Sequence, residues 1–273
     1  MILKIKYKER QLKFYLRRHS DFSSFYQVFV EKSYPNLLNK ITKGDVVIDA
    51  GANIGIFTVI SSILVGNDGC VLAIEPDPEN LSILKKNMEL NNLKNIKIIN
   101  KALYKESGSN KKFYQNGVMS KIITCETQNE TAYIDVETIT FDDLISQTGI
   151  RPNILKMDIE GGEKFALLYA KNMINTLNYL EAEIHSKEDW DELQKYSNYF
   201  SFKREAIESM HNVFSFGIKH PLKILKLEYY NRFRTTKRIV SSMTNNIHLE
   251  YPIIIYGESL RQHELNSNRD DLK

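Results

Sequence analysis

A glycine-containing run with an acidic residue at its head is the strongest chemical signal in the sequence. The run Asp49-Ala50-Gly51-Ala52-Asn53-Ile54-Gly55 directly follows the apolar stretch 46–48. Gly51 and Gly55 let a backbone turn tightly and approach a ligand closely, and the helix expected after them offers unpaired N–H groups. The run therefore predicts a loop that binds a nucleotide-like ligand.

Glu75 is the second signal, because it ends the next apolar stretch about twenty residues past Gly55. An acid in that place accepts hydrogen bonds from both ribose hydroxyls of a nucleoside. Dehydrogenases use the same acid but need G-x-G-x-x-G, whereas the loop here is G-x-x-x-G with Asp49 two residues ahead of Gly51. A carboxylate repels a pyrophosphate and attracts the ammonium of a methionine moiety. The loop therefore favours S-adenosylmethionine over a nicotinamide cofactor.

Polar side chains that follow two later apolar stretches are the candidate catalytic groups. Asp158 ends the stretch 153–157, and Glu183 and His185 follow each other at alternate positions at the end of the stretch 177–184. Because open α/β sheets bind ligands at the carboxyl ends of their strands, we expect Asp158, Glu183 and His185 to share one crevice.

Other charged residues near these stretches have structural interpretations. Glu181 lies on the same strand face as Glu183, and burying a carboxylate costs several kcal/mol unless it is paired. We expect it to pair with a basic neighbour such as Lys156. Glu160 and Glu163 lead into a helix; favourable electrostatics at the helix N-terminus explain Glu163, while the role of Glu160 stays open.

Two mechanisms stay open for the three candidate catalytic residues. In the first, which needs no metal, His185 is a general base, since its unperturbed pKa of about 6.5 suits that role, and Glu183 or Asp158 orients it. In the second, Asp158, Glu183 and His185 hold a divalent cation that binds the acceptor. Their spacing matches no metal motif, so the metal-free version is preferred.

The elements that position these residues follow from the apolar pattern. Short continuous apolar runs separated by helical stretches predict a doubly wound, mostly parallel α/β sheet with helices on both faces. The predicted strands cover 46–48, 70–74, 96–99, 153–157, 177–184 and 252–256. Alternating Leu, Ile and Lys residues before the first of them predict a hairpin within 1–18, then a helix capped by Asp21 that ends or bends at Pro35.

The chain divides into three predicted parts. Residues 1–40 form a hairpin and helix that pack on the core, residues 41–265 form one domain, and residues 266–273 are a disordered tail. Two segments interrupt the domain: 105–140, an inserted β-hairpin or flap, and 203–248, a basic helical insertion before the last strand. Residues 203–238 hold nine Lys and Arg against three Glu. We expect the hairpin and both insertions to build the acceptor site.

The stretches VVIDAGANIGIFT, AIEPDPENLSILKKNMELNN, VETITFDDL, ILKMDIEGGE and LEAEIH resemble the FkbM family of methyltransferases. The resemblance implies a Rossmann-like class I methyltransferase with a seven-stranded sheet that includes an antiparallel last strand. It implies methyl transfer, typically to a hydroxyl oxygen of a sugar or another small metabolite. By the same resemblance, the cofactor-binding residues are Asp49, Gly51, Asn53 and Gly55 on the methionine half, Glu75 on the ribose, and Pro76, Asp77 and Ala102 around the adenine.

Composition limits the partners and the compartment. The formal net charge is only +3, so any affinity for anions must come from local clusters. The basic segment 203–248 fits a lid over an anionic acceptor, a peripheral contact with an anionic membrane, a contact with nucleic acid, or an amphipathic helix packed on the sheet; among the functional interpretations we favour the lid. Cys70 and Cys125 are expected to be reduced, and no run reaches the roughly 18 apolar residues of a membrane span. We expect a cytoplasmic protein of undetermined oligomeric state.

Two other functions compete with methylation of a small molecule or glycan. A nucleic-acid methyltransferase would keep the cofactor, but base-amine enzymes use an Asn/Asp-Pro-Pro-aromatic turn where this chain has Asp158-Ile159-Glu160-Gly161, and an acidic mouth repels phosphates. A non-catalytic binding module would keep the cofactor pocket without needing the acidic residues around His185. The sequence therefore favours an O-methyltransferase.

Overall fold

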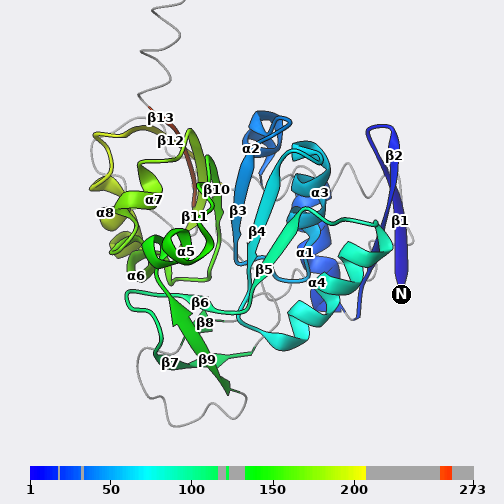
Figure 1. Cartoon of the computed structure of the whole chain (residues 1–273), viewed down its shortest axis with the longest axis horizontal. Coiled ribbons are helices and arrows are strands. Elements are labelled where there is room, and N and C mark those ends of the chain that lie inside the picture. The colour runs from blue at the N-terminus through cyan, green and yellow to red at the C-terminus, as the bar shows by residue number, and fades with distance from the viewer. Residues whose placement is uncertain (18, 32–33, 116–120, 123–132, 207–252, 260–273) are drawn as a thin grey trace, which may run out of the picture.

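A seven-stranded sheet forms the centre of the computed structural model, which describes residues 1–17, 19–31, 34–115, 121–122, 133–206 and 253–259 (Figure 1). The strand order is β12-β13-β11-β10-β3-β4-β5. The strands are β3 (Val46–Ala50), β4 (Cys70–Ile74), β5 (Ile96–Ile99), β10 (Ile154–Met157), β11 (Tyr179–Ile184), β12 (Phe200–Ala206) and β13 (Ile253–Ser259). Neighbours from β5 to β11 pair in parallel, whereas β13 is antiparallel to β11 and β12. The predicted doubly wound, mostly parallel sheet is confirmed.

Both faces of the sheet are covered, because alternate residues of each strand point to opposite sides. Val47 and Val71 pack in one cluster with residues of α3 (Ile56–Val65), whereas Ile48 and Leu72 pack in another with residues of α5 (Phe141–Thr148). Also packed on the sheet are α4 (Pro78–Leu90), α6 (Glu163–Leu167), α7 (Lys171–Ile174) and α8 (Lys187–Gln194). The buried strands are therefore apolar throughout except where they carry the charged residues of the site.

The first forty residues contain the predicted hairpin, followed by two α-helices and a π-helical turn where a single helix was predicted. Strands β1 (Ile2–Tyr7) and β2 (Arg10–Tyr15) are antiparallel, and α1 (His19–Tyr26), a π-helical turn (Gln27–Glu31) and α2 (Pro35–Lys40) follow. Pro35 is the first residue of α2. The prediction that Asp21 caps the helix is wrong, because α1 begins at His19 and the Asp21 carboxylate binds the backbone N–H and guanidinium of Arg17.

The first predicted insertion forms a second, smaller sheet of order β6-β9-β7-β8, below the central sheet in Figure 1. Its strands are β6 (Ala102–Leu103), β7 (Asn110–Tyr114), β8 (Lys121–Ile122) and β9 (Tyr133–Ile139). Because β7 and β9 are antiparallel, the expectation of an inserted hairpin is confirmed. We call this sheet the flap.

The predicted start of the second insertion at residue 203 is wrong. Strand β12 continues to Ala206 and pairs with β13 along its whole length. The run Lys203-Arg204-Glu205 hid this strand because its charges read as part of the basic segment, although charges are common on edge strands. Residues 207–248 and 266–273 lie outside the described residues. Among the helices that are described, none has the length and apolar character needed to cross a bilayer.

The turn between β3 and α3 requires its first glycine. Gly51 has φ +75°, and a Cβ atom there would lie 1.8 Å from the carbonyl oxygen of Asp158, a backbone atom of β10's following loop. Gly55, the N-cap of α3, has φ +82° and lies against the Leu84 side chain. The glycines thus let the loop lie directly against two neighbouring elements.

Gly51→Ala is therefore predicted to destabilise the protein by more than the roughly 1–3 kcal/mol that a strained backbone conformation costs alone, because Asp158 must also move. Gly149→Ala is the matched control, since Gly149 has φ +66° with no atom within 4 Å of its added Cβ. Urea denaturation of both variants compares the two free energies of unfolding. Equal losses would show that the contact with Asp158 has no cost.

Candidate active site

A cleft of about 980 Å³, counted with its open mouth, lies at the carboxyl ends of β3, β4 and β10. This is the edge of a parallel sheet where ligands bind. Residues 51–54, Glu75, Pro76, Ala102 and Asp158 are among those that line it, and Phe113 and Ile122 of the flap contribute another wall.

Glu75 forms hydrogen bonds to two loops, the glycine loop after β3 and the loop after β4. The side chain is buried, with 4% of the residue exposed; Oε2 accepts the N–H of Asn53 at 2.8 Å, and Oε1 accepts the N–H of Asp77 at 3.0 Å. Asn53 has φ +50°, a left-handed conformation that asparagine tolerates. Burial raises the pKa of Glu75 to about 7, although both backbone N–H groups lower it. Glu75 is thus a buried acceptor in the lining of the cleft.

The remaining residues expected at the cofactor lie close to this carboxylate. Pro76 and Ala102 line the cleft. Asp77 caps α4 by accepting the N–H of Glu79 at 2.8 Å, and it also accepts the side-chain amide of Gln115 at 3.0 Å. Asp77 therefore connects the flap to the β4–α4 loop.

Asp49 lies behind the glycine loop. No part of it is exposed; its carboxylate lies 3.3 Å from the ammonium of Lys156 and accepts the hydroxyl of Thr58 at 2.5 Å. Burial raises its pKa, whereas Lys156 and Thr58 lower it. Lys156 lines the cleft and also donates to the carbonyl oxygens of Ala50 and Gly51, at 3.2 and 2.8 Å. Asp49 therefore contacts the cleft indirectly, through Lys156, whose ammonium also binds the carbonyl oxygens of the glycine loop.

The three residues expected to be catalytic come together around one imidazole. His185 Nε2 lies 3.9 Å from Asp158 Oδ1 and 3.8 Å from Glu183 Oε1. Asp158 lines the cleft and accepts the hydroxyl of the buried Tyr34 at 3.0 Å. Asp158 is therefore the member of this group placed to meet a substrate.

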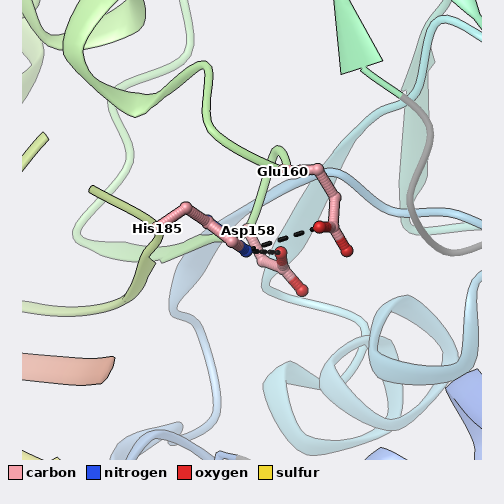
Figure 2. A group of neighbouring side chains, drawn as sticks. All are labelled: Asp158, Glu160 and His185. Atoms are coloured by element: carbon pink, nitrogen blue, oxygen red, sulfur yellow. Dashed lines mark ion pairs between the residues drawn. The ribbon is translucent and has the colours of Figure 1, made fainter. Parts of the chain in front are cut away.

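Two further carboxylates complete the group. Glu160 Oε2 lies 3.5 Å from His185 Nε2, and Figure 2 shows Asp158 and Glu160 facing the imidazole together. Glu163 is fully buried and places Oε1 3.2 Å from His185 Nδ1 and 3.0 Å from the N–H of Ile159. Glu163 does begin α6, as expected, but it also contacts the imidazole. We call these residues the carboxylate cluster: Asp158, Glu160, Glu163 and Glu183 around His185.

The cluster changes the protonation of its imidazole. Burial lowers the pKa of His185, but hydrogen bonding to Glu163 and the charges of Glu163, Asp158 and Glu183 outweigh burial and raise this pKa to about 10. At neutral pH the imidazole in this arrangement is therefore protonated on both ring nitrogens, and both can donate hydrogen bonds. Burial raises the pKa of Glu163, although the hydrogen bond to His185 and its charge lower it.

The same place could hold a metal ion. Asp158, Glu160 and His185 each offer a ligand atom, and these atoms lie within 4.8 Å of one another (Figure 2). The sequence analysis expected Glu183 in place of Glu160. Oxygen and nitrogen ligands of this kind suit a divalent cation.

Three contributors escaped the sequence analysis or were given another partner. Tyr34 lies just before Pro35, where the predicted helix ends or bends, and no role was predicted for it. Asn80 was not singled out either, although its side-chain nitrogen lies 3.4 Å from Glu75 Oε1. Lys156 was expected beside Glu181; its ammonium lies at Asp49 and the loop carbonyls, while Glu181 accepts the N–H of Leu37 at 2.8 Å. Strand register does not decide between these partners, because Lys156 lies opposite Asp49 on β3 and opposite Glu181 on β11.

Comparison with known proteins gives a consistent result. The model of the methyltransferase FkbM domain matches residues 49–220. Methyltransferase 1 of Beauveria bassiana is 26% identical over 162 residues, 50% of this chain and 62% of that protein. Hexuronic acid methyltransferase AglP of Haloferax volcanii is 26% identical over 160 residues, 58% of this chain and 64% of that protein. The chain thus spans slightly under two thirds of the length of these relatives.

Solved structures also align with the chain. An FkbM methyltransferase from Methylobacillus flagellatus is 17% identical, with 70% of this chain and 52% of that chain covered and a TM-score of 0.43. A SAM-dependent O-methyltransferase from Thermotoga maritima is 13% identical, with 94% and 77% covered and a TM-score of 0.44.

Removing Lys156 should leave a carboxylate buried without its cation. Lys156→Met is predicted to destabilise the protein by about 3–5 kcal/mol, measured by urea denaturation. The double variant Asp49→Asn with Lys156→Met removes both charges and should recover most of this loss. If the single and double variants are equally unstable, the ion pair is not what holds the loop.

Proposed function

Because the chain belongs to the FkbM methyltransferase family, we propose that it transfers the methyl group of S-adenosylmethionine to a hydroxyl oxygen of a sugar, glycan or other small metabolite. The family makes the protein an S-adenosylmethionine-dependent methyltransferase. The observation that carries the choice of oxygen is the carboxylate cluster, which lines the cleft with Asp158 and Glu160. A group that accepts a proton in that place suits a hydroxyl, whose proton must leave as its oxygen is methylated.

We assign the parts of the cofactor to different parts of the cleft. The Glu75 carboxylate, already held by two backbone N–H groups, has acceptor capacity for ribose hydroxyls. Pro76 and Ala102 offer apolar contact for an adenine ring beside it. The glycine loop, supported by Lys156 and Asp49, would receive the methionine half. Bound S-adenosylmethionine supplies a methyl group on a sulfonium, which leaves readily as a neutral thioether.

Asp158 is the proposed proton acceptor. It lines the cleft, whereas Glu183 and His185 support it from behind, and the hydroxyl of Tyr34 fixes one of its oxygens. The methyl group would leave sulfur, with the electron pair of the S–C bond left on sulfur, as the new O–C bond forms. The hydroxyl proton passes to Asp158. Because His185 is protonated in this arrangement, we propose that it orients Asp158 and does not act as the base.

The class of acceptor is supported by one relative. The Haloferax volcanii protein is named for a hexuronic acid, and a sugar hydroxyl fits a site in which a carboxylate takes the proton. The carboxylate cluster would repel the many phosphates of a nucleic acid more strongly than the single carboxylate of a hexuronic acid, which argues against the nucleic-acid alternative. The anionic character of the acceptor and the membrane contact stay predictions, because they depend on residues 207–248. The cytoplasmic location also stays a prediction.

The decisive experiment combines binding with transfer. Methyl-labelled S-adenosylmethionine is incubated with a panel of hexuronic acids, nucleotide sugars and neutral sugars. With an acceptor that is methylated, Asp158→Asn should lower the rate by about 10²–10⁴-fold, as expected for loss of a proton acceptor, while S-adenosylhomocysteine still raises the melting temperature. Glu75→Ala should abolish that rise. Full activity of Asp158→Asn would overturn its role, and no stabilisation of the wild type would overturn the cofactor assignment.

A second mechanism shares the same residues. A divalent cation held by Asp158, Glu160 and His185 would polarise the acceptor oxygen, and the 4.8 Å grouping of their ligand atoms favours it. In that case Asp158 serves as a ligand.

The metal-free mechanism predicts that EDTA leaves the rate of methyl transfer unchanged and that Mn²⁺ binds no more tightly to the wild type than to Glu160→Gln. Calorimetric titration with Mn²⁺ and activity after dialysis against EDTA measure the two quantities. A rate that falls in EDTA and returns with Mg²⁺, together with Mn²⁺ binding that Glu160→Gln weakens, would select the cation mechanism instead.

A further inference from the structure

The N-terminal hairpin is docked on α4, on the side of the molecule shown at the right of Figure 1. Three asparagines on one face of α4 make the contact. Asn91 exchanges two hydrogen bonds with the backbone of Lys13, of 3.0 and 2.7 Å. Asn87 Oδ1 accepts the N–H of Tyr15 at 2.6 Å. These side chains therefore satisfy the backbone of β2 in the way a neighbouring strand would.

Arg17, directly after the hairpin, makes the third contact. Its Nη2 donates to Asn80 Oδ1 at 2.7 Å. Asp21, which is 2% exposed, holds the guanidinium through Nε and Nη2, both at 3.0 Å. Because the guanidinium is fixed by a buried carboxylate, it offers Asn80 a donor in one set position.

The side-chain nitrogens of Asn80 and Asn87 contact the two loops that line the cleft, the loop after β4 and the glycine loop. Asn80 Nδ2 lies 3.4 Å from Glu75 Oε1, and Asn87 Nδ2 donates to the carbonyl oxygen of Ile54 at 2.8 Å. An amide side chain has one oxygen and one nitrogen end. Since the hairpin supplies donors to both oxygens, both nitrogens are turned toward the loops.

We propose that the hairpin is part of the cofactor site, with Arg17 and Tyr15 positioning the Glu75 and Ile54 loops through Asn80 and Asn87. None of the hairpin falls within residues 49–220, the part that the FkbM domain matches. Arg17 is a positioning residue, because it acts on the ribose-binding carboxylate through Asn80. The identity of the ligand rests on the proposed function; the relay itself does not.

The consequence of losing Arg17 follows from the amide. An Asn80 side chain released from its donor can turn its oxygen toward Glu75, where two acceptors repel each other. The ionised form of Glu75 then loses a hydrogen bond, so the pKa of Glu75 should rise above its present value of about 7. Ribose hydroxyls are bound best by the ionised carboxylate, so cofactor affinity should fall on the acid side.

The charged groups around Glu75 allow this effect to be isolated. Asp77 lies beside it and raises its pKa, Lys101 lines the same cleft, and Glu79 lies 3.7 Å from Arg17. Removing a positive charge anywhere nearby would favour the protonated carboxyl slightly. A control must therefore lose an arginine from the same hairpin without touching Asn80, and the exposed Arg10 meets that requirement.

The test is calorimetric titration with S-adenosylhomocysteine between about pH 6 and about pH 9, on both sides of the raised pKa of Glu75, about 7. Arg17→Met should shift the midpoint of the pH dependence upward by about one unit, which weakens binding about tenfold at the acid end and little at the alkaline end. Asn80→Asp should shift it further, since it puts a carboxylate against Glu75. Arg10→Met should follow the wild type.

A second measurement works without any ligand. The side-chain carboxyl of Glu75, labelled with ¹³C and assigned by Glu75→Gln, is titrated by NMR in the folded wild type and Arg17→Met. The proposal predicts a higher midpoint in the variant. An unchanged midpoint, or weakening of S-adenosylhomocysteine equally at every pH, would overturn the relay and leave Arg17 a role in stability alone. If wild type binds no S-adenosylhomocysteine while the NMR midpoint still moves, the cofactor assignment fails and the relay stands.

Discussion

The fold depends at its centre on an ammonium and a carboxylate that face each other between two parallel strands. Lys156 and Asp49 lie in register on β10 and β3, nearly without exposure, and the same ammonium holds the carbonyl oxygens at the start of the glycine loop. Burying either charge alone is costly, so each fixes the other. The loop is thereby held against Asp158 at a separation that only glycine allows, and the two halves of the site, cofactor loop and carboxylate cluster, are set relative to each other.

Most of the sheet could be predicted because its signal is local. Strands buried on both faces read as short apolar runs, and the glycines and Glu75 follow such runs directly. Asp158, Glu183 and His185 were found by the same logic, since charged residues at the carboxyl ends of strands are conspicuous. Strand β12 was missed because an edge strand tolerates charges, so Lys203 and Arg204 carried no strand signal.

The remaining parts of the site were hidden because they depend on contacts between distant segments. Tyr34 reaches Asp158 across 124 positions of the sequence, and Arg17 reaches Asn80 across 63. Glu163 was assigned to a helix terminus, which is correct but incomplete, because the imidazole it contacts comes from another strand. The sequence pattern identifies polar residues in places where apolar ones are expected. The residues that these polar side chains contact are decided by how the helices and strands pack.

Strand β13 lies between β11 and β12, although both of those precede it in the chain. Through its whole length β12 pairs with β13, and residues 207–252 separate the two in sequence. A pairing across so long a separation closes a large loop and forms slowly. During synthesis from the N-terminus, the edge of β11 that later pairs with β13 therefore stays unpaired after the loops of the site have been synthesised. This edge is the part of the sheet most exposed to pairing with a wrong strand, so folding of the nascent chain should be most vulnerable there until β13 arrives.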